Sequence, residues 1–327
     1  MSIKVLKKTA LASDIEKSLA LQLPSPVQHV NWPFFIQTTK PKANNGNEAQ
    51  TRSIVVKRDD LIHPIISGNK WRKLSPIVLL AIKNNWRHLA SFGGAYSNHL
   101  HALGYVCKEL GIKCTAIIRG DYSQHPSPTI MDLIAWGTDI VYVTKREYQF
   151  RQEPDYQQQM TKRLKADMLI PEGGTTTKYL QGVTSIIDEL NAQSNIEQLV
   201  LPIGSGGTMA GLIQAQSTTK PLNIHGISVL KGEGYHPKII QHLLSSRSPK
   251  NTWQIHEQFH HGGYAKTSEP LLQFSQHFSK HTSIALDKVY NAKSFYALNQ
   301  LLIEQAFEEA EKICILHTGG TQGNRKI

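Results

Sequence analysis

Residues 201–211 read Leu-Pro-Ile-Gly-Ser-Gly-Gly-Thr-Met-Ala-Gly: an apolar run enters a cluster of small residues, and a helical pattern follows. Glycines let a backbone approach an anion closely, and the start of a helix offers unpaired N–H groups. Hydroxyl side chains at such a turn can add donors. The segment therefore predicts a strand–turn–helix unit that binds a phosphate through Gly204, Ser205, Gly206, Gly207 and Thr208. A plain tight turn is the competing interpretation.

Short apolar runs of the same kind alternate with amphipathic segments along the chain. The expected strands are residues 54–56, 88–92, 114–118, 140–143, 168–170, 199–203, 224–229 and 313–317. The expected helices are residues 98–110, 129–136, 149–165, 179–190 and 209–215, and an exposed loop is expected at 42–52. This alternation predicts an α/β fold with parallel sheets covered by helices. Ligands of such sheets collect at the carboxyl ends of the strands.

Two other glycine-containing loops follow expected strands. Residues 91–99 read Ser-Phe-Gly-Gly-Ala-Tyr-Ser-Asn-His and precede a helix whose N-terminus suits a carboxylate. Ser97 is a good N-cap, and by itself it is best explained as a cap alone. Residues 315–323 read Ile-Leu-His-Thr-Gly-Gly-Thr-Gln-Gly and place the Thr318 hydroxyl at the end of the last expected strand.

Three further side chains carry possible chemistry. Lys70 follows Ser-Gly-Asn at the start of an expected helix. A lysine whose amine is held neutral can form a Schiff base, although most lysines are solvated surface residues. Tyr264 follows two glycines, and Tyr290 follows an acidic turn. Tyrosines usually pack in cores, so these two are candidates for a functional role only when they are considered with the other motifs.

The bulk composition excludes several classes of protein. The chain has 327 residues, 40% of them hydrophobic and 19% charged, which suffices for two domains or one large α/β unit. No apolar run approaches the roughly 18 residues of a membrane helix, and Glu16 and Lys17 interrupt the N-terminal segment. We therefore expect neither a membrane span nor a signal peptide. The three cysteines lack metal-site spacing, which predicts buried, reduced thiols, no metal and a cytoplasmic location.

Two other classes of function stay open at this point. A non-enzymatic module could bind nucleic acid through the net charge of +11, but no basic stripe or nucleic-acid motif is present, and we expect no such partner. A nucleotide-dependent oxidoreductase could use residues 204–211, which loosely fit a dinucleotide fingerprint. The acidic residue expected about 20 positions further on is missing, however, and the loop also lacks the ending of a Walker A motif.

Taken in order, the motifs resemble the pyridoxal phosphate (PLP) enzymes of the D-cysteine desulfhydrase and 1-aminocyclopropane-1-carboxylate (ACC) deaminase family. That family has the tryptophan-synthase-β-like fold, also called fold type II. The similarity runs from about residue 57 to residue 320. Its motifs are Lys-Arg-Asp-Asp-Leu at 57–61, Ser-Gly-Asn-Lys at 67–70, Gly-Gly-Ala-Tyr-Ser-Asn-His at 93–99, Pro-Glu-Gly-Gly at 171–174, Gly-Ser-Gly-Gly-Thr at 204–208, Leu-Asp-Lys-Val-Tyr at 286–290 and His-Thr-Gly-Gly at 317–320. Any one motif could arise by chance, whereas the ordered set is highly specific.

The resemblance implies four contacts with the cofactor. Lys70 would hold PLP as an internal aldimine and later move protons, and the loop 204–208 would bind the phosphate. Asn98 would hydrogen-bond the ring hydroxyl. Thr318 would approach the pyridine nitrogen, where a neutral hydroxyl leaves the ring less protonated than a carboxylate would.

The resemblance also implies the substrate contacts. Ser97, Asn98 and His99 would bind the substrate carboxylate, while Tyr264 and Tyr290 would shape the pocket. The implied catalytic residues are Lys70, Ser97, Tyr264 and Tyr290. Thr318 resembles the desulfhydrase pattern. Asn291 matches neither pattern, and Lys288 stands where a proline is usual.

The implied architecture has two open, twisted, mostly parallel sheets flanked by helices, with PLP in the cleft between two domains. We expect a large PLP-binding domain at residues 1–72 and 184–327, a smaller inserted domain at 73–183, and a homodimer. The implied function is a lyase or deaminase that acts on a small amino acid. The foremost expectation is α,β-elimination of the D-cysteine desulfhydrase type, which gives pyruvate, ammonia and hydrogen sulfide. The alternative is ACC deaminase, which gives 2-oxobutyrate and ammonia.

Overall fold

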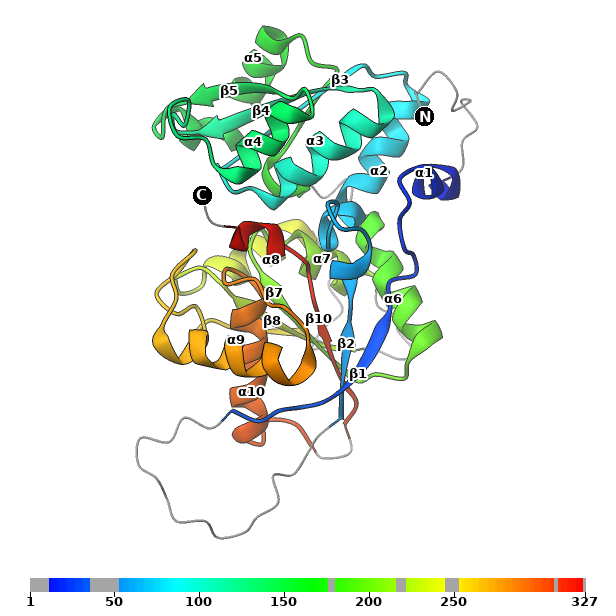
Figure 1. The fold of residues 1–327 in the computed structure, drawn as a ribbon, viewed down its shortest axis with the longest axis vertical. Coiled ribbons are helices and arrows are strands. Elements are labelled where there is room, and N and C mark those ends of the chain that lie inside the picture. The colour runs from blue at the N-terminus through cyan, green and yellow to red at the C-terminus, as the bar shows by residue number, and fades with distance from the viewer. Residues whose placement is uncertain are drawn as a thin grey trace. The chain divides into compact units, whose positions relative to one another are not determined.

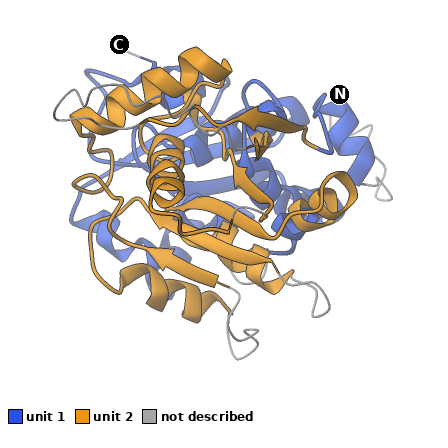
Figure 2. Cartoon of the chain, turned by 90° about the horizontal axis from the view of Figure 1, so that it is seen from below, with its two compact units in different colours: residues 1–24, 60–185, 322–327 blue, residues 25–59, 186–321 orange. Residues whose placement is uncertain are grey.

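The computed structural model describes residues 12–35, 53–175, 180–215, 222–244, 253–308 and 311–325. The chain forms two compact units: residues 1–24, 60–185 and 322–327 belong to the first, and residues 25–59 and 186–321 to the second (Figure 2). The expected loop 42–52 lies outside the described residues. The domain boundaries expected after residues 72 and 183 stay predictions. In the structure, residues 60–72 lie with the first unit.

The first unit is built on a four-stranded parallel sheet. In spatial order its strands are β5 (Asp139–Val143), β4 (Lys113–Arg119), β3 (His88–Gly93) and β6 (Met168–Ile170). Its helices are α1 (Ala12–Ser18), α2 (Asn69–Lys83), α3 (Asn98–Leu110), α4 (Pro128–Ala135) and α5 (Pro154–Leu164), with short 3-10 turns at Asp59–Leu61, Glu147–Gln152 and Glu172–Gly174.

Side-chain alternation along β4 divides the core of this unit into two layers. Ala116 and Ile118 pack in a cluster with Leu133 of α4, whereas Ile117 packs in a separate cluster with Met160 of α5. Successive residues of a strand point to opposite faces, so both faces of this sheet are buried under helices. Figure 1 shows α3 and α4 along one face of the sheet.

The second unit is built on a six-stranded sheet in which every pair is parallel except β1 with β2. In spatial order its strands are β1 (Val27–Asn31), β2 (Ser53–Lys57), β10 (Ile313–Leu316), β7 (Gln198–Ile203), β8 (Asn223–Ser228) and β9 (Trp253–His256). The remaining helices are α6 (Gln181–Gln193), α7 (Gly207–Gln214), α8 (Tyr235–Leu244), α9 (Glu269–Thr282) and α10 (Asn291–Ile303), with a 3-10 turn at Thr321–Asn324. Phe274 and Phe278 of α9 and Phe295 of α10 share one core cluster with Val200 and Ile227 of the sheet.

The predicted α/β class with two mostly parallel sheets is confirmed. All eight expected strands are present within one or two residues of their expected ends, and the sequence did not reveal β1 or β9. The three cysteines are buried and unbridged, as expected. Of the helices that the structure describes, none has both the length and the apolarity needed to cross a bilayer.

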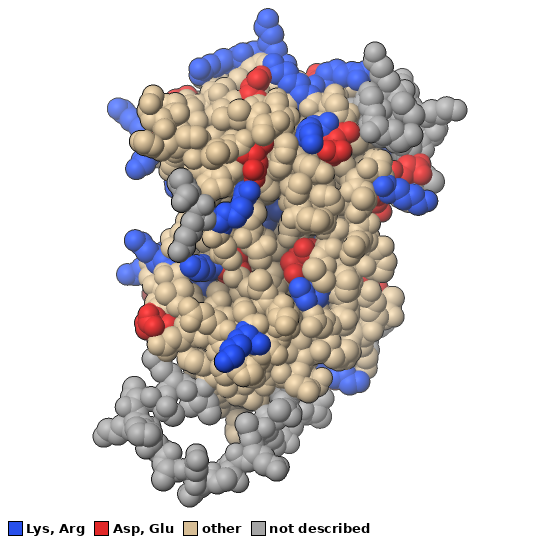
Figure 3. Space-filling view, in the orientation of Figure 1, with Lys and Arg blue, Asp and Glu red and all other residues tan. Residues whose placement is uncertain are grey.

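Charged side chains are distributed over both units. On the face drawn in Figure 3, Lys and Arg side chains lie in separate groups, with Asp and Glu side chains among them. The face drawn in Figure 3 therefore shows no continuous basic patch, which would be the electrostatic footprint of a nucleic-acid site. The expected absence of a nucleic-acid partner stays a prediction.

Candidate active site

Lys70 lies in the first turn of α2, in the first unit. The preceding cap residue is Gly68 with a φ of 75°, a left-handed conformation that favours glycine. The Lys70 side chain is half-buried, and its Nζ donates a hydrogen bond to the Asn69 Oδ1. The expected nucleophile therefore projects from the rigid start of a helix, as preorganised sites require.

Lys73 lies one turn further along α2 and is more deeply buried than Lys70. Its Nζ donates to the Thr175 Oγ1 at 3.1 Å and to the Gly173 carbonyl at 3.4 Å. Burial, and after it the positive charge of Lys70, lower the pKa of Lys73 to about 7. The sequence analysis did not select Lys73, because nothing in its pattern distinguishes it from a surface lysine.

Removing Lys73 is expected to flatten the pH dependence of stability. Between pH 7 and about 10.5 the unfolded chain binds a proton at Lys73 that the folded chain has released, so the free energy of unfolding rises with pH in that window. In Lys73→Met this rise is lost. Urea unfolding from pH 7 to 10 measures it, with Lys83→Met at the exposed end of α2 as control. Parallel pH curves for wild type and Lys73→Met would contradict the expectation.

The loop after β3 leads into α3 as predicted, and Ser97 is its N-cap. The Ser97 Oγ accepts a hydrogen bond from the Leu100 N–H at 3.2 Å. The cap uses a lone pair of the hydroxyl, so its hydrogen can still be donated to an anion. The N-cap interpretation is confirmed, and a carboxylate-binding role for the same hydroxyl remains chemically compatible with it.

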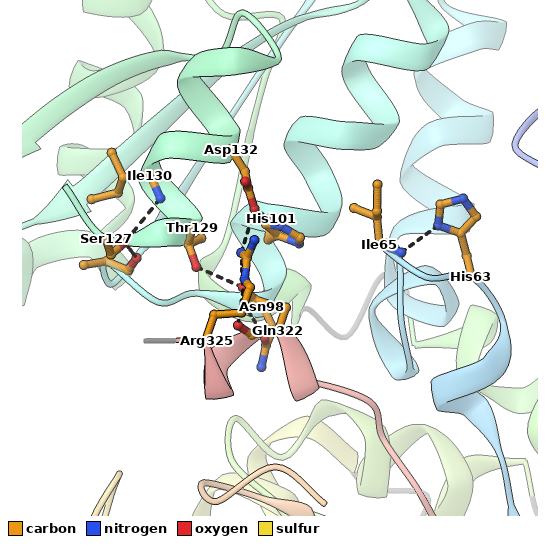
Figure 4. Close-up of polar contacts among 11 residues, drawn as sticks. His63, Ile65, Asn98, His101, Ser127, Thr129, Ile130, Asp132, Gln322 and Arg325 are labelled. Carbon is orange, nitrogen blue, oxygen red and sulfur yellow. Dashed lines mark hydrogen bonds and ion pairs between the residues drawn. The ribbon is translucent and has the colours of Figure 1, made fainter. Parts of the chain in front are cut away.

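The side chain of Asn98 is held by the C-terminal segment of the first unit (Figure 4). The Gln322 Nε2 donates to the Asn98 Oδ1, while the Gln322 Oε1 accepts from the Thr129 Oγ1 at 3.0 Å and from the Arg325 Nη2 at 3.1 Å. With its oxygen bound in this way, the Asn98 carboxamide can offer only its NH₂ group as a further donor. A ring hydroxyl or a carboxylate is a suitable acceptor for that group.

His99 presents an acceptor. The Ser91 hydroxyl donates to the Ile170 carbonyl at 2.8 Å, so the His99 Nε2, 2.9 Å from the Ser91 Oγ, carries the proton of that contact. Burial, and then the charges of Lys73 and Lys70, lower the pKa of His99 to about 3 and keep the ring neutral. Among the described residues its buried Nδ1 has no hydrogen-bond partner. In this tautomer Nδ1 suits a donor such as a hydroxyl or an ammonium group better than a carboxylate.

The glycine loop of the second unit joins β7 to α7. Gly206 has a φ of 80°, and a Cβ atom there would lie 2.9 Å from Ile239. A Cβ atom on Gly204 would lie 2.9 Å from the ring of Tyr290. Both positions therefore exclude larger residues, and the loop leaves its backbone N–H groups at the start of a helix, where an anion is stabilised.

A buried histidine that the sequence analysis missed fixes this loop. The His236 Nε2 donates to the Gly204 carbonyl at 2.9 Å, and its Nδ1 lies 2.7 Å from the Ser228 Oγ. Burial lowers the pKa of His236, which favours the neutral ring. The two hydrogen bonds connect the loop to the carboxyl end of β8.

Tyr264 and Tyr290 lie together in the second unit. Their ring centroids are 6.2 Å apart at 71°, an edge-to-face arrangement. The wholly buried Lys293 of α10 donates to the Gly263 carbonyl at 2.7 Å and to the Val229 carbonyl at 3.3 Å, and so holds the turn that carries Tyr264. Burial lowers the pKa of Lys293 to about 8, although nearby Asp287 opposes the shift.

Thr318 follows β10 and is bound to the start of α10. Its N–H and its hydroxyl both contact the Asn291 Oδ1, at 2.9 and 3.3 Å. The structure thus groups the predicted residues within each unit: Lys70 with His99 in the first, and Gly204 with Tyr290 and Tyr264 in the second. Nowhere in the described parts of the chain does a group of three or more His, Cys, Asp or Glu side chains form that could hold a metal ion.

Comparison with known proteins identifies the class. The model of the family described as pyridoxal-phosphate dependent enzyme matches residues 34–319, so the chain belongs to that family. It is a PLP enzyme, and this result favours the leading prediction over the nucleotide-dependent oxidoreductase. The residues present fit the cofactor. Lys70 supplies an amine at the start of α2, and the loop 204–208 has glycines at positions that exclude larger side chains, at the start of a helix where a phosphate is stabilised.

Individual relatives point to two related activities. A Thermotoga maritima protein provisionally named 1-aminocyclopropane-1-carboxylate deaminase is 29% identical over 286 residues, covering 83% of this chain and 89% of the relative. The mitochondrial bifunctional D-cysteine desulfhydrase/1-aminocyclopropane-1-carboxylate deaminase of Arabidopsis thaliana is 26% identical over 322 residues, covering 92% and 77%. The crystal structure of an ACC deaminase homologue matches with a TM-score of 0.74 at 24% identity and covers 95% of each chain, a likeness of fold.

Proposed function

We propose that this chain is a PLP-dependent lyase that cleaves a small amino acid by α,β-elimination, with D-cysteine as substrate and pyruvate, ammonia and hydrogen sulfide as products. One water molecule is consumed for each D-cysteine. The observation that carries the choice of reaction is the contact between Asn291 and Thr318. Both side chains are neutral, and the hydrogen-bonding groups of the Asn291 amide are all used, so this contact contains no carboxylate. Names of relatives support both this activity and the deaminase.

The Lys70 amine would attach the cofactor and, once displaced by the substrate amine, take the proton from Cα. When bound, PLP supplies the electron sink that stabilises negative charge at Cα. Lys73, whose pKa is lowered to about 7, lies one helical turn away and donates to Thr175 and the Gly173 carbonyl, which holds it apart from this role. Cleavage of the Cβ–S bond then releases hydrosulfide.

Two sets of residues would bind the reactants. The Ser97 hydroxyl, the Asn98 NH₂ group and the N–H groups at the start of α3 are donors for the substrate carboxylate. The loop 204–208 would bind the PLP phosphate, and Tyr264 with Tyr290 would border the substrate. The cytoplasmic location expected from the cysteines and the homodimer implied by the family resemblance remain part of this proposal.

ACC deaminase activity is the second candidate, favoured by the edge-to-face tyrosine pair. Because ACC carries no Cα hydrogen, its ring opening needs a proton to be taken or given near Cβ, and Tyr264 and Tyr290 are the paired hydroxyl-bearing side chains available for that step. The product would be 2-oxobutyrate with ammonia.

One assay separates the candidates. Purified, PLP-loaded protein is incubated with D-cysteine, L-cysteine, D-serine and ACC in parallel, and pyruvate, 2-oxobutyrate and sulfide are measured. We expect sulfide and pyruvate in equal amounts from D-cysteine and no 2-oxobutyrate from ACC. Release of 2-oxobutyrate without sulfide would establish the second candidate. Protein that binds PLP and yields none of these products would contradict both.

A further inference from the structure

Asn291 is the first residue of α10 and is wholly buried. Its side-chain nitrogen donates to the Asp287 Oδ1 and to the Gly319 carbonyl, the latter at 2.7 Å. Its side-chain oxygen accepts from the N–H and the hydroxyl of Thr318. Both hydrogens of the amide are therefore used, and its oxygen receives two donors, which leaves the side chain saturated.

The orientation of this amide follows from its neighbours. The Asp287 carboxylate already accepts backbone N–H bonds from Val289, Tyr290 and Asn291 at 2.8–3.0 Å, and it has no hydrogen to give. The Gly319 carbonyl is likewise an acceptor only, so the NH₂ group of Asn291 must face these two oxygens. The amide oxygen then faces Thr318, whose N–H can only donate.

This orientation determines how the Thr318 hydroxyl is turned. The buried hydroxyl lies 3.3 Å from the Asn291 oxygen and can satisfy that contact only by donating its hydrogen. The Thr318 oxygen then has lone pairs but no hydrogen for a ligand on its other side. Without Asn291 the hydroxyl would be free to rotate and either donate or accept.

We propose that Asn291 is a positioning residue that makes the Thr318 hydroxyl a hydrogen-bond acceptor toward the PLP ring nitrogen, and thereby favours the protonated ring. The inference rests on the proposed function and on the approach of Thr318 to that nitrogen, which the family resemblance implies. A protonated ring withdraws charge from Cα more strongly, so Asn291 would act on the reaction through Thr318 without touching substrate.

The sign of one measurement tests this proposal. Protein loaded with PLP labelled with ¹⁵N in the ring is titrated by NMR, and the ring-nitrogen shift gives the pKa of that nitrogen. If the hydroxyl accepts, Thr318→Val removes the partner of the protonated form, and the pKa falls by roughly one unit, the tenfold effect of one hydrogen bond. If the hydroxyl donates to an unprotonated nitrogen, the same variant raises the pKa, which overturns the proposal.

Three further variants test whether the effect depends on Asn291. Thr318→Ser keeps the hydroxyl and should keep the wild-type ring pKa. Asn291→Leu should lower it, and Asn291→Leu combined with Thr318→Val should lower it no further than Thr318→Val alone. If Asn291→Leu does not fold, the Thr318 pair still decides whether the hydroxyl accepts from the ring nitrogen, and a hydroxyl that donates overturns the proposal. A ring signal that titrates like free PLP would overturn the proposed function as well, whereas bound PLP whose ring pKa is unmoved or raised in Thr318→Val overturns this inference alone.

Discussion

Replacing Lys70 with alanine is expected to abolish covalent attachment of PLP and to lower kcat by about 10²–10⁴-fold. The loss follows because the same amine would form the bond to the cofactor and move the Cα proton, and positioned proton transfer contributes an effect of that size. Borohydride reduction followed by peptide mapping measures attachment, and steady-state kinetics with D-cysteine measures turnover. Lys83→Ala, at the exposed end of the same helix, is the matched control and should retain both properties.

Lys73 is the amine that could contradict this expectation. It lies one turn from Lys70, and its pKa of about 7 makes part of it neutral at physiological pH. Its hydrogen bonds to Thr175 and to the Gly173 carbonyl direct it elsewhere. A reduced adduct mapped to the Lys73 peptide, or a Lys70→Ala protein with wild-type kcat, would show that Lys70 is not the attachment site.

Replacing Glu189 with glutamine is expected to lower the free energy of unfolding by about 3–5 kcal/mol. Lys57 of β2 is wholly buried, and its Nζ lies 2.7 Å from the Glu189 Oε2, 2.6 Å from the Ser25 carbonyl and 2.8 Å from the Gln193 Oε1. Three acceptors use the three hydrogens of the ammonium group, so the charge is fully paired. Removing the carboxylate charge leaves a buried cation without its counterion.

Urea unfolding at pH 7 measures this loss. The exposed ion pair of Lys113 and Asp139, 3.0 Å apart, is the matched control, and Asp139→Asn should change stability by less than about 1 kcal/mol. The double variant Lys57→Met with Glu189→Leu should recover much of the stability, because it removes both charges together. A Glu189→Gln protein as stable as the Asp139→Asn protein would show that the buried pair contributes little.

Local patterns of apolar residues in the sequence were sufficient to predict most of the strands. Six of the eight predicted strands have four or more buried residues in a row, and such runs are readable without knowledge of the partner strand. β1 and β9 were missed because they are the edge strands of their sheet, four or five residues long and partly polar. An edge strand needs less apolar surface than a central strand, so its sequence lacks the apolar run from which the other strands were predicted.

Some residues of the candidate site could likewise be predicted from local sequence, and others could not. The glycine loops and the Ser97 cap could be read from adjacent residues, since turns and helix starts have local chemistry. Gln322, His236 and Lys293 could not. Gln322 binds Asn98 across 224 positions of sequence, and His236 binds the Gly204 carbonyl across 32. Such side chains become recognisable only when the fold brings them to their partners.

The position of β10 in its sheet has a consequence for how this protein is made. β10 lies between β2 and β7, pairing with both, yet it is the last strand of the described chain. During synthesis the ribosome releases β2 and β7 long before residues 313–316 exist. The six-stranded sheet therefore cannot close until residues 313–316 have been made, because β2 and β7 are joined only through β10, the strand that also leads to Thr318.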